Sequence, residues 1–289
     1  MRPPSMGAMR LLVTGAAGML GRAVADAARE RGHDVAALAR ASLDVTDPGS
    51  LAAALALTRP DAVVNCAAWT DVDGAETAER HATAVNGAGA GAVAAAAARA
   101  GAFVVHVSSD YVFDGRAREP YREDAPRAPL GAYGRSKLAG EQAVAAAAPD
   151  AHAIVRTAWL FGPHGRNFVD TILRAGAERG ELDVVDDQVG SPTFAGHLAP
   201  ALLAISQART RGVLHVAGTG TASRYTLAEE ALRQAGVTCA LRRARTVDLP
   251  AAAPRPAYSV LASTRADAPR LPGWREGVAA HVARAVAAR

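Results

Sequence analysis

The sequence is poor in cysteine, in aromatic residues and in long apolar runs, and each shortage excludes a class of protein. Its 289 residues include two cysteines, Cys66 and Cys239, without metal-ligand spacing, which excludes a disulfide framework and a cysteine zinc site. Aromatic residues make up only 4%, so the core must be built mostly from Ala, Val and Leu. No apolar run reaches the roughly 18 residues of a membrane span, and the first ten residues lack the apolar stretch of a signal peptide. We therefore expect a cytoplasmic protein with no membrane partner and a disordered extension before Arg10.

Lysine is almost absent. Among the 32 lysine and arginine residues, Lys137 is the only lysine. A chain that uses arginine for most cations would keep lysine where a compact ammonium with a movable pKa is needed, with chance as the alternative. The net charge of +4 and the pI near 9.5 come from scattered arginines. Because no aromatic-studded basic surface accompanies them, we expect no nucleic-acid partner.

The first half of the chain alternates short apolar runs with helix-like segments, several of which end at glycines. This alternation is typical of a parallel sheet that is covered by helices on both faces. We predict strands over 10–14, 34–39, 61–67, 103–108 and 153–157, and helices over 18–31, 48–58, 81–100 and 133–148. The predicted fold class is therefore α/β, with a Rossmann-type doubly wound parallel sheet.

Three glycines lie where the first predicted strand meets the first predicted helix, in the pattern Gly15-x-x-Gly18-x-x-Gly21. Gly15 permits a tight turn, Gly18 lets the backbone approach a pyrophosphate, and Gly21 allows close helix–strand packing. The free N–H groups at the start of the helix can then bind phosphate oxygens. The motif predicts a dinucleotide cofactor; the alternative is a glycine-rich turn in an α/β protein without a cofactor.

The end of the second predicted strand distinguishes between two dinucleotides. An NAD site places an acid there for the ribose 2′-hydroxyl, whereas this chain has Arg40, which would bind a 2′-phosphate. We therefore predict NADPH, with NADH as the alternative if Arg40 is only a surface residue. Asp44 and Val45 are expected at the adenine, and Ala67 and Ala68 beside the ribose and pyrophosphate.

Tyr133 and Lys137 are four residues apart at the start of a predicted helix, so their side chains lie on one face. A phenol with a pKa near 10 is a weak acid–base catalyst at neutral pH, and a nearby ammonium lowers that pKa. The strand 103–108 runs into Ser109, whose hydroxyl can polarise a substrate carbonyl. We predict that Ser109, Tyr133 and Lys137 are catalytic. The expected cofactor site comprises Gly15, Gly18, Met19, Leu20, Arg40, Asp44, Val45, Ala67, Ala68, Thr70, Tyr133 and Lys137.

The second half of the chain is less regular and contains prolines at positions 192, 200, 250, 254, 256, 269 and 272. We predict only two clear helices there, over 194–207 and 226–236, and a return of 213–216 to the main sheet. The predicted organisation is an NADP-binding Rossmann domain over 9–157, with a return segment over 194–217. A smaller, discontinuous C-terminal substrate lobe comprises 158–193 and 218–289.

Several further motifs accompany the glycines and the Tyr133–Lys137 pair. They are Asn65-Cys-Ala-Ala-Trp-Thr-Asp-Val-Asp73, Ser108-Ser-Asp-Tyr-Val-Phe-Asp-Gly115, Gly140-Glu141, Arg156-Thr-Ala-Trp159, Asn167-Phe-Val169, Asp187-Gln-Val-Gly-Ser-Pro-Thr193 and Arg255-Pro-Ala-Tyr-Ser259. From Arg10 to its end, the chain resembles the dTDP-4-dehydrorhamnose reductase family of extended short-chain dehydrogenase/reductases.

The resemblance implies a reaction: NADPH reduces the C4 ketone of dTDP-4-dehydro-L-rhamnose, a dTDP-linked 4-keto-6-deoxyhexose, to give dTDP-L-rhamnose. Tyr133 would protonate the alkoxide at C4, Lys137 would hold the nicotinamide ribose, and Ser109 would hydrogen-bond the carbonyl. The implied substrate-binding residues are Ser109, Asp110, Tyr111, Trp159, Asn167 and Arg255. Arg255 would meet the diphosphate, unless it forms a surface salt bridge; Trp159 would pack near the sugar, unless it is a core residue.

Other activities on this scaffold remain as alternatives. Gly74 and Phe161 stand where relatives often have Lys and Tyr, which leaves open another dTDP-4-keto-6-deoxysugar, such as an antibiotic or dihydrostreptose-type sugar. A dehydratase would need an Asp-Glu pair where this chain has Asp110-Tyr111. A non-catalytic alternative is an NADP-binding regulatory subunit like that of methionine adenosyltransferase. Some relatives dimerise through acidic residues and Mg²⁺, so Mg²⁺ is a possible further ligand, but we can place no Mg²⁺ or other metal ligands in this sequence. A monomer and a homodimer are both left open.

Overall fold

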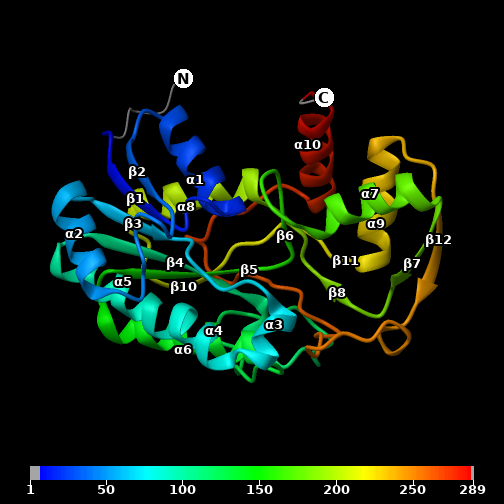
Figure 1. Ribbon diagram of the computed structural model, residues 1–289, viewed down its shortest axis with the longest axis horizontal. Helices are drawn as coiled ribbons and strands as arrows, with labels where there is room; N and C mark the ends of the chain where they lie inside the picture. Colours follow the sequence, from blue (N-terminus) through cyan, green and yellow to red (C-terminus); the bar gives the residue numbers. More distant parts are fainter. Residues whose placement is uncertain (1–6, 288–289) are drawn as a thin grey trace.

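The computed structural model of the chain describes residues 7–287 (Figure 1). The disordered extension predicted before Arg10 falls mostly outside this range. The main sheet lies on one side of the molecule in the view of Figure 1, and a smaller group of helices and strands lies on the other.

A six-stranded sheet forms the centre of the larger part, in the order β10-β5-β4-β3-β1-β2. Its strands are β1 (Arg10–Thr14), β2 (Asp34–Leu38), β3 (Ala62–Asn65), β4 (Phe103–Ser109), β5 (His152–Thr157) and β10 (Gly212–His215). All neighbouring strands pair in parallel. The Rossmann-type α/β prediction is confirmed. The strand order reverses between β1 and β3, so the carboxyl ends of these strands border the crevice where such sheets bind ligands.

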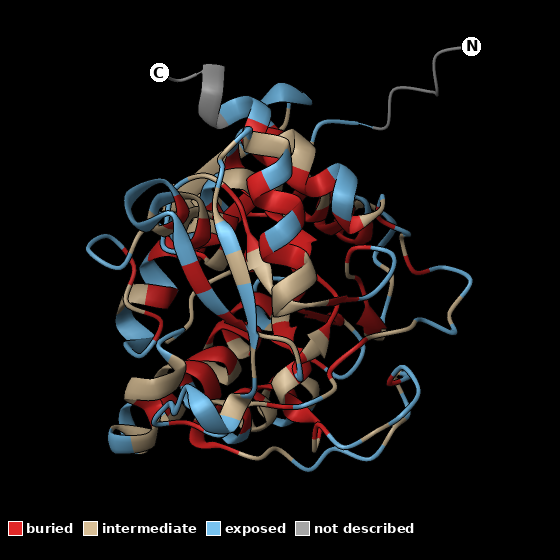
Figure 2. Cartoon of the chain, turned by 90° about the vertical axis from the view of Figure 1, so that its right-hand side faces the viewer, coloured by how far each residue is buried: buried red, intermediate tan, exposed pale blue. Residues whose placement is uncertain are grey.

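Helices cover both faces of the sheet (Figure 1). They are α1 (Met19–Glu30) and α8 (Ala195–Ala208) on one face, and α2 (Pro48–Thr58), α5 (Ala90–Arg99) and α6 (Ala132–Ala147) on the other. Because side chains alternate along a strand, Leu11 and Val13 of β1 join the core under α1 and α8, whereas Leu12 joins the opposite core. The buried residues lie mainly on the strands and on the inward sides of the helices (Figure 2). No helix within residues 7–287 has the length and apolar character needed to cross a membrane.

The predicted long helix over 81–100 is confirmed as a continuous helical segment, but it contains a π-helical turn that was not predicted. After α3 (Val72–Thr77), α4 (Glu79–Thr83) leads into the π-helical turn over Ala84–Gly89, which continues into α5. The extra residue in the π turn directs the Asn86 side chain inward, where it is fully buried and hydrogen-bonded to another part of the chain. Hydrophobic periodicity does not report such a turn, because it is stabilised by a distant partner.

The second half of the chain is more regular than predicted. Helices α8 and α9 (Arg224–Ala235) agree with the prediction within about two residues, but α7 (Phe168–Arg179) and α10 (Trp274–Ala287) were missed. Strands β7 (Glu181–Val185) and β12 (Ala240–Ala244) pair in parallel beside them. Shorter strands complete this part: β6 (Leu160–Phe161), β8 (Val189–Gly190), β9 (Thr193–Phe194) and β11 (Ala222–Ser223).

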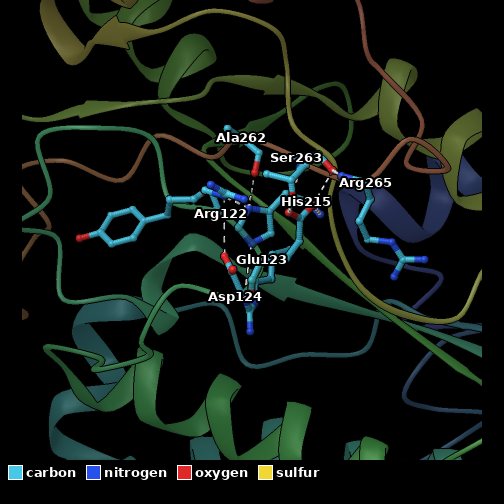
Figure 3. Close-up of polar contacts among 10 residues, drawn as sticks. Arg122, Glu123, Asp124, His215, Ala262, Ser263 and Arg265 are labelled. Carbon is cyan, nitrogen blue, oxygen red and sulfur yellow. Dashed lines mark hydrogen bonds and ion pairs between the residues drawn. The ribbon is translucent and has the colours of Figure 1, made fainter.

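Glu123 ties the C-terminal segment to the edge strand β10 (Figure 3). Its carboxylate accepts hydrogen bonds from the Ser263 hydroxyl, from Thr264 N at 3.1 Å and from His215 N at 3.2 Å. Although burial raises it, these bonds together hold the pKa of Glu123 near 2. The His215 ring also contacts the Ala262 carbonyl at 3.0 Å. Residues 262–264 are therefore fixed against the edge of the sheet at β10, and residues 253–260 precede them in the chain.

Candidate active site

The glycine turn brings β1 and β3 together at the crevice. Gly15 has φ +64°, and a Cβ atom there would lie 2.6 Å from Ala67 N, on the chain leaving β3. A Cβ at Gly21 would lie 2.3 Å from the Gly15 carbonyl oxygen. Gly18, at the N-cap of α1, offers no side chain to the first N–H groups, and the first turn contains no acid. These N–H groups are therefore available to an anion.

A cavity of about 710 Å³ opens at the carboxyl ends of the strands. Every residue of the predicted cofactor site lines it: Gly15, Gly18, Met19, Leu20, Arg40, Asp44, Val45, Ala67, Ala68, Thr70, Tyr133 and Lys137. Ser109, Asp110, Tyr111 and Trp159 of the predicted substrate site line it as well. The cavity thus brings together residues that are spread along the sequence from Gly15 to Trp159.

Lys137 lies one turn after Tyr133 on α6 and is 2% exposed. Its ammonium donates to the Val107 carbonyl oxygen of β4 at 2.7 Å. Burial lowers the pKa of Lys137 to about 8, against the opposing effect of Glu141. The side chain is thus fixed against the strand with further donors available on the cavity side.

The prediction that Lys137 lowers the pKa of Tyr133 is wrong for this structure. Burial and the neighbouring Asp110 raise the pKa of Tyr133, while contact with the Ser109 hydroxyl partly offsets them. The ammonium of Lys137 instead bonds to Val107. Tyr133 is therefore protonated at neutral pH and can donate a proton.

Asp110 is buried beside Ser109 at the end of β4. The Ser109 hydroxyl donates to Asp110 Oδ1 at 2.8 Å and accepts from Tyr111 N at 3.2 Å. Asp110 Oδ2 is buried without a hydrogen-bond partner among the described residues. Burial raises the pKa of Asp110 to about 6, although contacts with Ser259 and Ser109 lower it. The site thus contains a carboxyl group that titrates just below neutral pH.

A fully buried ion pair joins the catalytic helix to the sheet. Arg156 of β5 binds Glu141 of α6 through two bonds, Nε–Oε1 at 2.8 Å and Nη2–Oε2 at 2.7 Å, and both side chains are 1% exposed. Ser108 donates to Glu141 Oε1 at 2.6 Å. Glu141 follows Lys137 by one helical turn, so the pair fixes α6 against the ends of β4 and β5.

Asn86 of the π turn holds the loop after β3 against α6. Its side chain accepts from Trp69 N at 2.8 Å and donates to Trp69 O at 3.0 Å. It also donates to Ser136 Oγ at 2.9 Å, and that hydroxyl bonds to the Tyr133 carbonyl oxygen. The cofactor side and the catalytic side of the crevice are therefore linked through one amide.

Trp159 stands at the mouth of the cavity in an unusual backbone conformation. Its φ is +46°, a left-handed value that is costly for a bulky side chain. Its ring lies over Gly190, where an added Cβ would come within 2.4 Å of the indole. This gives a physical role to the glycine of the Asp187–Thr193 motif, because only glycine leaves room for the ring.

The structure does not bring Asn167 and Arg255 into the lining of this cavity. Asn167 is the N-cap of α7: it accepts from Asp170 N at 2.9 Å and donates to Gly162 O at 3.0 Å. Arg255 forms an ion pair with Asp73 at 2.7 Å, the surface pair that we had given as its alternative. Within residues 7–287, no cluster of three or more His, Cys, Asp or Glu side chains is arranged to hold a metal.

Sequence reasoning missed Arg224, the first residue of α9. It lines the cavity opposite Asp110, and its guanidinium lies 3.6 Å from the centre of the Trp159 ring. The serine before it marks the start of a helix, but no local pattern indicates that this side chain reaches the cavity.

Comparison with known proteins agrees with this geometry. The family described as "RmlD substrate binding domain" matches residues 9–287. A dTDP-4-dehydrorhamnose reductase of Mycobacterium tuberculosis is 45% identical over 284 residues, which are 95% of this chain and 92% of the relative.

This chain belongs to the RmlD family.

Structural comparison supports the assignment to the RmlD family. A crystal structure of dTDP-4-dehydrorhamnose reductase from Bacillus anthracis in complex with NADP superimposes with a TM-score of 0.93 at 34% identity, covering 96% of this chain and 100% of the other. A Streptomyces antibioticus relative, 47% identical over 260 residues, is called a probable dTDP-4,6-dihydroxy-2-methyloxan-3-one 4-ketoreductase; the match covers 89% of this chain and 88% of the relative. A UDP-glucose 4-epimerase of Thermus thermophilus, at 20% identity and TM-score 0.83, shares the fold.

The buried ion pair leads to a stability prediction. Glu141→Gln leaves the Arg156 guanidinium charged and buried without its carboxylate, so we expect a loss of about 3–5 kcal/mol in the free energy of unfolding. The matched control is Glu79→Gln, which removes the exposed pair with Arg135 and should cost at most about 1 kcal/mol. Denaturant unfolding measures both. Equal effects of the two substitutions would contradict the prediction.

The carboxyl group of Asp110 leads to a second stability prediction. Its pKa is raised from 3.8 to about 6 on folding, so its favourable contribution is present below pH 4 and is lost as pH rises through 6. Asp110→Asn should therefore stabilise the protein above pH 6, by roughly 1–3 kcal/mol relative to the difference below pH 4. Unfolding experiments at several pH values test this, with the exposed Asp124→Asn as control. A difference from wild type that stays constant between pH 4 and 7 would contradict it.

Proposed function

We propose that this RmlD-family chain reduces the C4 ketone of dTDP-4-dehydro-L-rhamnose to dTDP-L-rhamnose with NADPH. The observation that carries the proposal is the group of Tyr133, Lys137 and Ser109 beside the glycine turn, in one cavity at the carboxyl ends of the strands. The names of relatives at about 45% identity, such as that of Mycobacterium tuberculosis, support the choice of substrate. When bound, NADPH supplies a hydride to C4.

Tyr133 supplies the proton that completes the reduction. As the carbonyl carbon accepts hydride, its oxygen becomes an alkoxide, and the phenol transfers its proton to that oxygen to give the alcohol. Burial and Asp110 keep the phenol protonated before reaction. The Ser109 hydroxyl would hydrogen-bond the same oxygen and orient the ketone.

The cofactor would lie along the glycine turn, with its pyrophosphate at the start of α1 and its nicotinamide ribose on Lys137. Close contacts at Gly15 and Gly21 support this fit, because a Cβ at either position would meet backbone atoms of the turn or of the Ala67 segment. Arg40 is exposed directly after β2, where it would bind the 2′-phosphate of NADPH. NADH is the weaker candidate, since it lacks that phosphate.

We also propose that the chain comprises two functional parts, one for the cofactor and one for the substrate. Residues 9–157 with the return segment 194–217 would form the NADP-binding domain, and residues 158–193 and 218–289 the substrate lobe. The protein would act as a monomer or as a homodimer. Cys66 and Cys239 are both free, which fits a reducing cytoplasm.

A second candidate is the reduction of another dTDP-4-keto-6-deoxyhexose by the same chemistry. The 47% identity to the Streptomyces antibioticus ketoreductase favours it, because that relative matches this chain as well as the rhamnose enzymes do. Elimination of water is not favoured, because Tyr111 stands where a dehydratase needs a carboxylate base. A purely regulatory subunit would have no need of Ser109, Tyr133 and Lys137 in one cavity.

The role of Tyr133 as the acid leads to a kinetic prediction. Tyr133→Phe should lower kcat for reduction of dTDP-4-dehydro-L-rhamnose by roughly 10²–10⁴-fold, because it removes the proton donor. NADPH binding should change little, and Tyr258→Phe, outside the cavity, should stay near wild type. NADPH absorbance follows the rate, and NMR of the product identifies the sugar. A wild-type protein that binds NADPH but reduces none of a panel of dTDP-4-keto sugars would overturn the proposed function.

The choice of cofactor leads to a specificity prediction. Arg40→Ala should raise the KM for NADPH by roughly 10–100-fold, the loss expected for hydrogen bonds to a charged phosphate, and leave the KM for NADH almost unchanged. Arg99→Ala replaces another exposed arginine, at the far end of α5, and serves as control. Initial rates at varied cofactor concentration measure both constants. An equal change in the KM values for NADPH and NADH would show that Arg40 does not bind the 2′-phosphate.

A further inference from the structure

Arg224 presents an unpaired cation inside the cavity. Its guanidinium carbon lies 3.6 Å from the centre of the Trp159 ring and 5.0 Å from that of Phe168. Within residues 7–287, no hydrogen bond or ion pair of this side chain to another residue is present, whereas its backbone N–H donates to Gln188 O. The rings of Trp159 and Phe168 therefore hold the guanidinium in place, while its five N–H donors stay free within residues 7–287.

Other partly or fully buried arginines in this chain are paired. Arg156 binds both oxygens of Glu141, and Arg255 binds Asp73. A partly buried guanidinium without a counter-ion is costly, so such a group in a native structure calls for a partner from outside. Burial lowers the pKa of Arg224 to about 10, against the effects of Tyr111 and Asp110, and the side chain stays charged at neutral pH.

The positions of the other cations indicate which ligand Arg224 meets. The basic residues that line the cavity are Arg40, Lys137, His164, Arg166 and Arg224. Arg40 lies two residues after the end of β2. Arg166 is next to Gly165, which lies beside the Met19 side chain at the start of α1. Arg40 and Arg166 therefore belong to the cofactor side of the cavity. Arg224 is on the opposite side, where its charge interacts with Asp110 and Tyr111 beside Tyr133. It is the arginine of the lining that remains for a second anionic ligand.

We propose that Arg224 binds the diphosphate of the sugar nucleotide and so positions the ketone at Tyr133. The inference rests on the proposed function for the identity of the substrate. It assigns to α9 the role that the sequence had suggested for Arg255, which is instead occupied by Asp73. Trp159 contributes by its contact with the guanidinium carbon, 3.6 Å from the ring centre, because this contact restricts the directions in which the planar group can present its donors to the phosphate oxygens.

Binding without turnover tests the inference. Titration calorimetry with dTDP, thymidine and NADPH would compare wild type, Arg224→Met and Arg275→Met. Methionine keeps an apolar side chain over the ring but removes the charge. Arg275 is a matched control, because it also stacks on a tryptophan, at 4.3 Å from the Trp274 ring, but is exposed and outside the cavity.

We expect Arg224→Met to weaken dTDP binding by roughly 10–100-fold and to flatten its dependence on salt. Thymidine and NADPH binding should stay within about two-fold of wild type, and Arg275→Met should bind all three normally. Unchanged dTDP affinity in Arg224→Met would overturn the inference. So would an equal loss for thymidine, which would indicate a packing role, and so would a wild-type protein that does not bind dTDP.

The same variant separates this inference from the proposed function. Arg224-dependent dTDP binding by a protein that reduces no dTDP-4-keto sugar would overturn the reductase but leave the diphosphate site. Turnover of the keto sugar by Arg224→Met with an unchanged KM for the sugar nucleotide would overturn the diphosphate site but leave the reductase. If both hold, the variant should raise the KM for the sugar nucleotide far more than it lowers kcat.

Discussion

The buried pair between Arg156 and Glu141 fixes α6, the helix that carries Tyr133 and Lys137, on the sheet. It joins β5 to α6 through two charge-assisted bonds, and Ser108 adds a third bond from the end of β4. The Tyr133–Lys137 turn lies immediately before Glu141, so a shift of this pair would move the proton donor relative to Ser109. Both charges are almost completely excluded from water, so either partner alone would be strongly unfavourable, and the register of helix and strands is correspondingly well defined.

Polar groups within residues 7–287 differ in how completely they are paired, both along the cavity and away from it, where His106 and His281 each have a buried ring nitrogen without a partner. Away from the cavity, carboxylates such as Glu123 have all the donors they need. Along the cavity, Asp110 has an oxygen without a partner and Arg224 has a guanidinium without a counter-ion. The strained φ of Trp159 belongs to the same group of features. Proteins commonly sacrifice stability in this way where a ligand completes the interactions.

The sequence predicted the parts of the fold and site whose signals are local. The glycine turn, the helix over 48–58, and the i, i+4 pair of Tyr133 and Lys137 each require only neighbouring residues, and the structure has all of them. The π turn around Asn86 was missed because its stabilising partner, Trp69, is distant in the sequence. Helix α7 was also missed; its N-cap is Asn167, which accepts a hydrogen bond from Asp170 N. Charges were the least predictable, since the pKa of Tyr133 depends on burial and on Asp110 rather than on its helical neighbour.

By itself, the sequence determined the α/β class, the alternation of parallel strands with helices, and the glycine turn, because periodicity, glycines and short spacings specify them within a few residues. Only the tertiary structure decided which arginine faces the cavity and which is paired elsewhere. Arg224 and Arg255 are equivalent as sequence letters, but one packs on Trp159 and the other meets Asp73 from a segment 182 residues away. That difference arises from packing between distant segments, and packing fixes which charges remain available to a ligand.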